Sequence, residues 1–129
     1  MSLSLFSCLP TEPQAIMQAE SSAQAGLTLP ATMSYAQLSS LLASPDSPVL
    51  LLDVRTAEEY AAGHIPGAVL APYDALAATF TEADKNRPIV LYCRSGNRSG
   101  IAMRTLRSMG YANLSDFGGI PNWKGGLEQ

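Results

Sequence analysis

Two short runs of apolar residues constrain the fold of this chain more than any other feature. The first covers residues 49–52 and is closed by Asp53, and the second covers residues 89–92 and leads directly into Cys93. A proline precedes each run, at Pro48 and Pro88. Continuous apolar runs of this length are typical of strands buried on both faces of a parallel sheet. The pattern therefore predicts two parallel strands whose carboxyl ends lie at Asp53 and Cys93.

Helix signals lie between and after these runs, so that strands and helices alternate along the chain. Ser34 caps a predicted helix that ends before Pro45, and Thr56 caps another over residues 57–62, which Gly63 ends. The remaining predicted elements are strands at 68–70 and 113–117, helices at 73–80 and 99–109 with Gly110 after the latter, a tight turn at 118–119, and a short helix at 121–124. This alternation predicts an α/β fold with a mainly parallel sheet, in which ligands bind at the carboxyl ends of the strands.

The length of 129 residues fits one domain preceded by an extension. Residues 1–33 are rich in Ser, Ala, Gln, Thr and Pro, and they predict an N-terminal extension that is flexible in part or forms one helix over residues 13–25. The alternating signals begin at Ser34, so the folded domain is assigned to residues 34–129. With 47% apolar residues, a domain of this size can bury a core.

Charge and cysteine content exclude several classes of protein. The net charge of -3 provides no global positive field, so no nucleic acid partner is expected. No window approaches the roughly 18 apolar residues that span a bilayer, so no membrane segment is expected. The expected location is cytoplasmic, or exported if a leader was removed from this chain. Two cysteines are too few for a disulfide framework, and Cys8 is interpreted as an incidental thiol of the extension.

The segment after the second run carries the predicted chemistry. Cys93 stands at the end of a buried strand and before a helix, where loop N–H groups and those of the first helical turn converge and form an anion cradle. The same groups stabilise a thiolate and lower the pKa of a cysteine. Gly96 allows close approach of the backbone, and Arg94 and Arg98 supply planar donors for an oxyanion. Cys93 is therefore predicted to be a nucleophile and not a structural cysteine.

Other polar and aromatic residues favour structural roles. Asp53 and Arg55 end the strand expected beside that of Cys93, where they form a structural ion pair or support the loop. His64 is expected to fix a turn by hydrogen bonds, because a cradled thiolate needs no base. Trp123 is expected to pack at the rim or in the core. Metal-ligand spacings, a phosphate-binding P-loop and a dinucleotide motif are all missing from the sequence, so no metal or cofactor is expected.

Three sequence motifs occur over residues 34–129, in the same order as in one known protein family. They are Leu51-Leu52-Asp53-Val54-Arg55 with Glu59-Tyr60 and Gly63-His64-Ile65-Pro66-Gly67-Ala68, then the loop from Cys93 to Ser99, then Gly118-Gly119 with Trp123. Together they resemble the rhodanese domain of sulfurtransferases in its single-domain bacterial form. The resemblance implies a rhodanese-like α/β fold, a mainly parallel five-stranded sheet flanked by helices on both faces, with the cysteine loop at its carboxyl edge.

The resemblance also implies an activity. Such domains take sulfane sulfur from thiosulfate or a related donor onto the loop cysteine and pass it to a thiol or cyanide, which makes Cys93 the persulfide carrier. The residues expected to bind the donor anion are Arg94, Ser95, Gly96, Asn97, Arg98 and Ser99, with Asp53 and Arg55 in support. The expected partners are thus a small sulfur-donor anion and a thiol or cyanide acceptor, or a protein sulfur donor or acceptor.

Three alternatives stay open. Phosphatases and arsenate reductases use a similar loop with one residue more between cysteine and arginine, whereas four residues separate Cys93 from Arg98. The tighter ring favours a single sulfur atom at its centre. A noncatalytic rhodanese-like interaction module usually lacks the cysteine that this chain keeps. A protein-to-protein sulfur relay needs the same loop as a thiosulfate enzyme, so the sequence does not separate these two functions.

Overall fold

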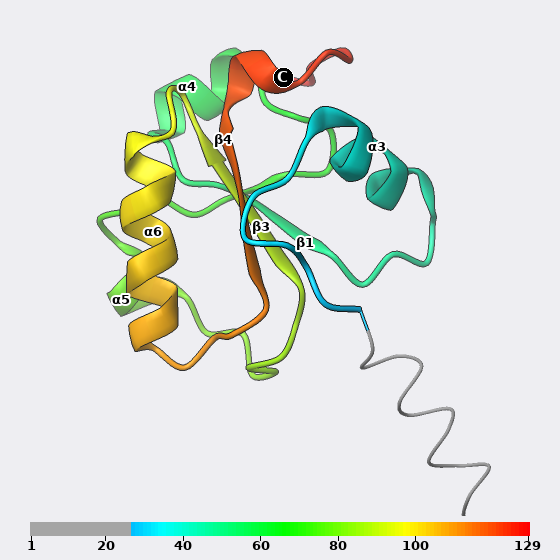
Figure 1. Ribbon diagram of the computed structural model, residues 1–129. Coiled ribbons are helices and arrows are strands. Elements are labelled where there is room, and N and C mark those ends of the chain that lie inside the picture. The colour runs from blue at the N-terminus through cyan, green and yellow to red at the C-terminus, as the bar shows by residue number, and fades with distance from the viewer. Residues whose placement is uncertain (1–26) are drawn as a thin grey trace, which may run out of the picture.

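The computed structural model describes residues 27–129 and has a four-stranded parallel sheet at its centre (Figure 1). The strands are β1 (Leu50–Asp53), β2 (Val69–Leu70), β3 (Ile89–Cys93) and β4 (Leu114–Gly119), in the spatial order β2-β1-β3-β4. The two central strands, β1 and β3, pair directly, with Asp53 opposite Tyr92. The two apolar runs of the sequence therefore form the centre of the sheet and end at the same edge.

Helices cover both faces of the sheet, which confirms the predicted α/β layers. The helices are α3 (Tyr35–Ala43), α4 (Ala57–Ala62), α5 (Leu76–Thr79), α6 (Asn97–Ser108) and the 3-10 helix η1 (Ile120–Asn122). Figure 1 shows α5 and α6 on one face and α3 on the other. Alternate strand residues enter the two cores: Leu91 and Cys93 pack with α6, whereas Val90 and Tyr92 pack with the layer of α3.

The helix ends follow the capping signals of the sequence. At α3 the Ser34 hydroxyl accepts from the Gln37 N–H at 3.2 Å, and the Gln37 side chain accepts from the Ser34 N–H at 2.9 Å. Thr56 and Glu59 form the same reciprocal capping box at the start of α4. These bonds satisfy N–H groups that the first helical turn leaves unpaired. Gly110 follows α6 with a φ of 101°, as expected for a residue that ends a helix.

The expected count of five strands is wrong for the described residues, in which the sheet has four. In place of a fifth strand, Thr32 forms one parallel bridge with Asp116 of β4. Farther back, the Asn113 side chain binds the backbone instead: its Oδ1 accepts from the Leu29 N–H at 2.8 Å and its Nδ2 donates to the Leu27 carbonyl at 2.7 Å. The Asn113 side chain thus bonds to the backbone N–H and carbonyl groups that a longer strand would pair with β4. After Ser34 the chain enters α3.

Three shorter elements also differ from the prediction. Gly118 and Gly119 belong to β4 and do not form a separate turn, because a bulge places Gly118 opposite Tyr92 and leaves Phe117 as the extra residue. The helix expected over 73–80 is confined to α5, since a turn in which the Ala75 N–H donates to the Pro72 carbonyl precedes it. The last helix is the 3-10 turn η1 rather than an α-helix over 121–124.

The end of the predicted extension packs onto the sheet. Leu29 and Met33 are buried in the same core layer as α3. The helix expected over residues 13–25 and the thiol of Cys8 lie outside the described residues, and the division of the chain at residue 34 stays a prediction. Within residues 27–129, no helix is long and apolar enough to cross a membrane.

Candidate active site at the cysteine loop

Cys93 ends the central strand β3, and α6 begins four residues later at Asn97. Gly96, which precedes the helix, has a φ of 103°, in the left-handed region that residues with a side chain rarely adopt. This conformation turns the loop back over the cysteine. As a result the Gly96 N–H donates to the Cys93 sulfur at 2.9 Å. Strand, glycine and helix start together place this loop N–H against the sulfur, and the binding of an anion there stays a prediction.

The sulfur atom is buried and surrounded by hydrogen-bond donors. Besides Gly96, the Ser99 hydroxyl lies 3.6 Å from Sγ. It accepts from the thiol and donates to the Gly96 carbonyl at 3.1 Å, whereas a thiolate accepts from it. Burial raises the pKa of the Cys93 thiol, but hydrogen bonds from the backbone and hydroxyl of Ser99 and from the backbone of Gly96 and Ser95 outweigh it, and the net pKa is lowered. The loop therefore stabilises a thiolate in a place with little solvent.

Replacing Ser99 with alanine is expected to raise the pKa of Cys93, because it removes one donor to the thiolate and leaves the backbone donors in place. A higher pKa lowers the thiolate fraction at neutral pH, so alkylation by iodoacetamide slows there and recovers at alkaline pH. Measuring the rate of alkylation across pH gives the pKa of Cys93 as the midpoint of the curve, for the wild type and for the variant. An unchanged midpoint in a folded variant would contradict a role for the hydroxyl.

The loop rests against the end of β4 at Gly119. A Cβ atom at this position would lie 2.8 Å from the Arg94 carbonyl oxygen and 3.3 Å from the Ser95 Cα. The first of these separations is shorter than carbon and oxygen atoms tolerate without bonding, and both neighbours belong to the backbone. The second glycine of the Gly118-Gly119 motif is thus required because the cysteine loop passes directly over it.

Replacing Gly119 with alanine is expected to displace residues 94–95 and to misalign the donors around the sulfur. We expect sulfur loading of Cys93 to slow by about tenfold to a hundredfold, the cost of misplacing reacting groups by part of an ångström. The matched control is Gly100→Ala in α6, where a Cβ would meet no atom within 4 Å. Normal loading in Gly119→Ala would mean that the loop adjusts without cost.

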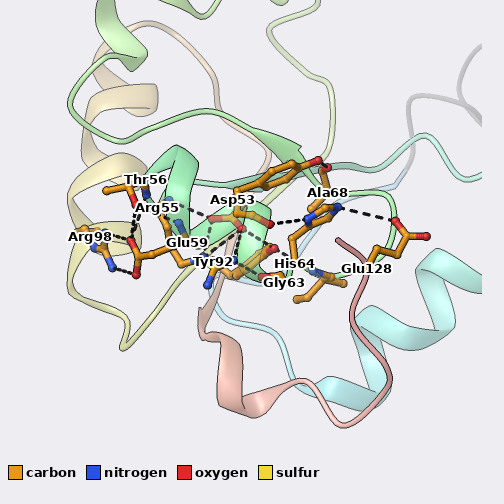
Figure 2. Close-up of polar contacts among 12 residues, drawn as sticks. Asp53, Arg55, Thr56, Glu59, Gly63, His64, Ala68, Tyr92, Arg98 and Glu128 are labelled. Atoms are coloured by element: carbon orange, nitrogen blue, oxygen red, sulfur yellow. Dashed lines mark hydrogen bonds and ion pairs between the residues drawn. The ribbon is translucent and has the colours of Figure 1, made fainter.

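The two loop arginines have different surroundings. Arg94 is exposed and has no ion-pair partner within residues 27–129. Arg98 instead forms a bidentate pair with Glu59 of α4, at 2.7 and 3.0 Å (Figure 2). Its guanidinium is thus engaged by a carboxylate, unlike that of Arg94 among the described residues. Two further expected anion binders, Ser95 of the loop and Asn97 at the start of α6, are exposed.

Asp53 and Arg55 form a buried ion pair beside the loop. The Asp53 carboxylate accepts from the Arg55 side chain at 2.7 to 3.1 Å, from the Arg55 backbone at 3.0 Å and from the Tyr92 hydroxyl at 2.8 Å. The remaining Arg55 hydrogen bond goes to the Gly63 carbonyl at 2.7 Å. Burial raises the pKa of Tyr92, so this hydroxyl stays protonated as a donor. The geometry fits the favoured interpretation, a structural pair, and Figure 2 shows it.

His64 and Trp123 take part in packing and hydrogen bonding. The His64 ring stacks on Tyr60 at 3.7 Å between centroids, and its Nδ1 lies 2.8 Å from the Tyr60 carbonyl oxygen. Its backbone exchanges two hydrogen bonds of 2.8 Å with Glu128. Trp123 packs edge-on against Tyr35. Neither side chain hydrogen-bonds to the Cys93 sulfur, so the structure places both outside the sulfur's immediate surroundings.

A cavity of about 320 Å³ lies beside the loop. Its lining residues are Arg55, Glu59, Ala62, Gly63, Arg94, Ile120 and Leu127. The lining joins two arginines and one carboxylate to an apolar wall. Among the described residues no group of His, Cys, Asp and Glu side chains is arranged to hold a metal ion.

Glu59 and Tyr92 are residues of this site to which the sequence analysis assigned no role. Glu59 was named only as part of the Glu59-Tyr60 motif, and its bond to Arg98 spans 39 positions. Tyr92 read as part of an apolar run, although its hydroxyl joins Asp53 to the Ile65 N–H. The signal for Glu59 was the capping-box spacing from Thr56.

A buried thiol at the junction of a central parallel strand and a helix defines an α/β protein with a cysteine-centred anion loop. The family model of the rhodanese-like domain matches residues 34–125. The chain therefore belongs to the rhodanese-like domain family, as the motifs predicted.

The chain is also similar to several proteins that are named as sulfurtransferases. A sulfurtransferase of Allochromatium vinosum is 42% identical over 76 residues, which cover 58% of this chain and 71% of that protein. A thiosulfate:glutathione sulfurtransferase of Saccharomyces cerevisiae is 32% identical over 102 residues, 69% of this chain and 73% of that protein. The solved human single-domain sulfurtransferase is 33% identical with a TM-score of 0.60, over 70% of this chain and 91% of that one. The chain spans between 16% and 45% of the length of four other curated relatives.

Proposed function

We propose that this protein is a sulfurtransferase that carries sulfane sulfur as a persulfide on Cys93. The observation that carries the proposal is the position of the sulfur, buried within hydrogen-bond distance of the loop N–H of Gly96 and close to the Ser99 hydroxyl. Sulfur transfer is the activity named for the relatives above. Thiosulfate or a related donor, with a thiol or cyanide as acceptor, is the substrate pair that this site supports best.

The reaction balances without a cofactor or a redox partner. The Cys93 thiolate attacks the outer sulfur of thiosulfate, the bond to the sulfonate sulfur breaks with its electron pair, and sulfite leaves. The outer sulfur remains on Cys93 as a persulfide with one negative charge, which the cradle donors stabilise. Cyanide or a thiolate then attacks this terminal sulfur and leaves as thiocyanate or as a new persulfide. The Cys93 thiolate is restored, and no proton is transferred in either half.

The absence of a base at the sulfur agrees with this chemistry. Within the described residues, the groups hydrogen-bonded to Sγ are backbone N–H groups and a hydroxyl, with no imidazole or carboxylate among them. A thiolate that is already stable needs no proton acceptor. The Arg98 guanidinium binds Glu59, which argues against its closing a phosphate ring as in the phosphatase alternative.

The decisive experiment measures the intact mass of the reduced protein after incubation with thiosulfate. The expected result is the gain of one sulfur atom, with sulfite released in equal amount, followed by loss of that sulfur as thiocyanate when cyanide is added. Cys8→Ser serves as the control for the other thiol and should load normally. A folded protein that gains no sulfur from thiosulfate would refute this donor, and loading only from a protein persulfide would favour the relay.

A further inference from the structure

Glu59 places a carboxylate on the wall of a cavity that Arg94, the residue after Cys93, also lines. Both of its oxygens bind Arg98, and Oε1 also accepts from the Thr56 N–H at 3.1 Å. These hydrogen bonds, led by those from Arg98, lower the pKa of Glu59 to about 2, so the group is ionised at every working pH. The residue that binds Arg98 therefore also contributes a permanent negative charge to the cavity that Arg94 lines.

The charges around the cavity nearly cancel. Its charged lining residues are Arg55, Arg94 and Glu59, of which Arg55 pairs with Asp53 and Glu59 with Arg98. Two ion pairs leave Arg94 as the net positive charge, and a thiolate on Cys93 cancels it. A donor that carries two negative charges thus meets a site with little net attraction beyond the N–H groups of the loop.

We propose that Glu59 is a specificity-determining residue that reduces the preference of this site for doubly charged over singly charged sulfur donors. The inference rests on the proposed uptake of sulfur by Cys93. Without the Glu59 charge, Arg98 would act unopposed on whatever occupies the cavity, and the second charge of thiosulfate would gain from it. The apolar part of the wall, formed by Ala62, Ile120 and Leu127, offers no such charge and suits an organic substituent.

A matched pair of donors isolates this effect. Methanethiosulfonate has the same reactive sulfur as thiosulfate but carries a methyl group in place of one charged oxygen. The Cys93 thiolate attacks its outer sulfur, and methanesulfinate leaves in place of sulfite, so that charge and atoms balance in both reactions. A change in the pKa or nucleophilicity of Cys93 affects both loading rates equally, because both donors react with the same thiolate. The ratio of the two rates is therefore independent of such a change.

The experiment measures the second-order rate constant of persulfide formation by quenching and intact mass, for each donor. For Glu59→Gln we expect the thiosulfate to methanethiosulfonate ratio to rise about threefold to tenfold, the effect of one unit charge across several ångströms of partly hydrated protein. The amide can still accept from the Thr56 N–H and keep the helix cap. The rate with thiosulfate should also fall more steeply with added salt than in the wild type.

Matched variants separate charge from structure. Glu58→Gln removes the same charge from an exposed neighbouring position and should leave the ratio within about twofold, because solvent screens it. Arg98→Gln should lower the ratio, and the Glu59→Gln, Arg98→Gln double variant should return it towards the wild-type value. A wild type that takes sulfur from neither donor refutes small sulfur-donor anions as substrates of this site, and with them the role of Glu59. A wild type that loads from both, with the same ratio in folded Glu59→Gln, overturns only the role of Glu59.

Discussion

Replacing Cys93 with serine is expected to abolish sulfur transfer, lowering thiocyanate production from thiosulfate and cyanide by more than about a thousandfold. The donors around Sγ lower the pKa of a thiol, but a serine hydroxyl is far less acidic, and within residues 27–129 no base lies at hydrogen-bond distance to activate it. Oxygen also forms no persulfide. The measurement combines the rate of thiocyanate formation with the intact mass of the quenched protein.

Serine is chosen because it keeps the cradle intact. The Gly96 N–H that donates to the sulfur can donate to a hydroxyl, and the smaller atom fits the buried position. The thermal midpoint should therefore stay close to that of the wild type. Cys8→Ser is the parallel control and should retain full activity. More than a tenth of the wild-type rate in a folded Cys93→Ser protein would show that another nucleophile carries the sulfur.

Local signals were sufficient to predict most of the fold. The apolar runs became the central strands because a strand buried on both faces needs no polar alternation. Ser34, Thr56 and Gly110 marked helix ends because capping depends on residues only a few positions apart. The position of Cys93 followed from the same logic, since the end of a parallel strand and the start of the next helix meet at one edge.

Contacts between distant residues were not predictable in this way. The sequence does not indicate that Arg98 meets Glu59, because only the packing of α4 against the start of α6 brings them together. The prediction of a fifth strand was wrong for a similar reason, because the Asn113 side chain hydrogen-bonds to the backbone of residues 27 and 29. Gly119 looked like a turn residue because nothing local reveals that the Arg94 carbonyl lies above it.

Replacing Asp53 with alanine is expected to destabilise the fold by about 3–5 kcal/mol, the usual cost of removing one partner from a buried ion pair. Asp53 is fully buried, and Arg55 is 6% exposed. Without the carboxylate, the guanidinium keeps the Gly63 carbonyl as its one acceptor among residues 27–129, and the Tyr92 hydroxyl loses Asp53 as its acceptor. Since β1 and β3 pair at this point, the loss acts on the centre of the sheet. Urea unfolding with linear extrapolation measures the change.

Two comparisons test whether the cost comes from an isolated buried charge. Glu82→Ala breaks the partly exposed pair with Arg87 and should cost less than the loss at Asp53, because solvent still reaches both partners. Adding Arg55→Met to Asp53→Ala removes the unpaired charge and should recover part of the stability, since an apolar side chain of similar length can fill the site. A loss below about 1 kcal/mol in Asp53→Ala would mean that water reaches Arg55 in the folded protein and replaces the carboxylate.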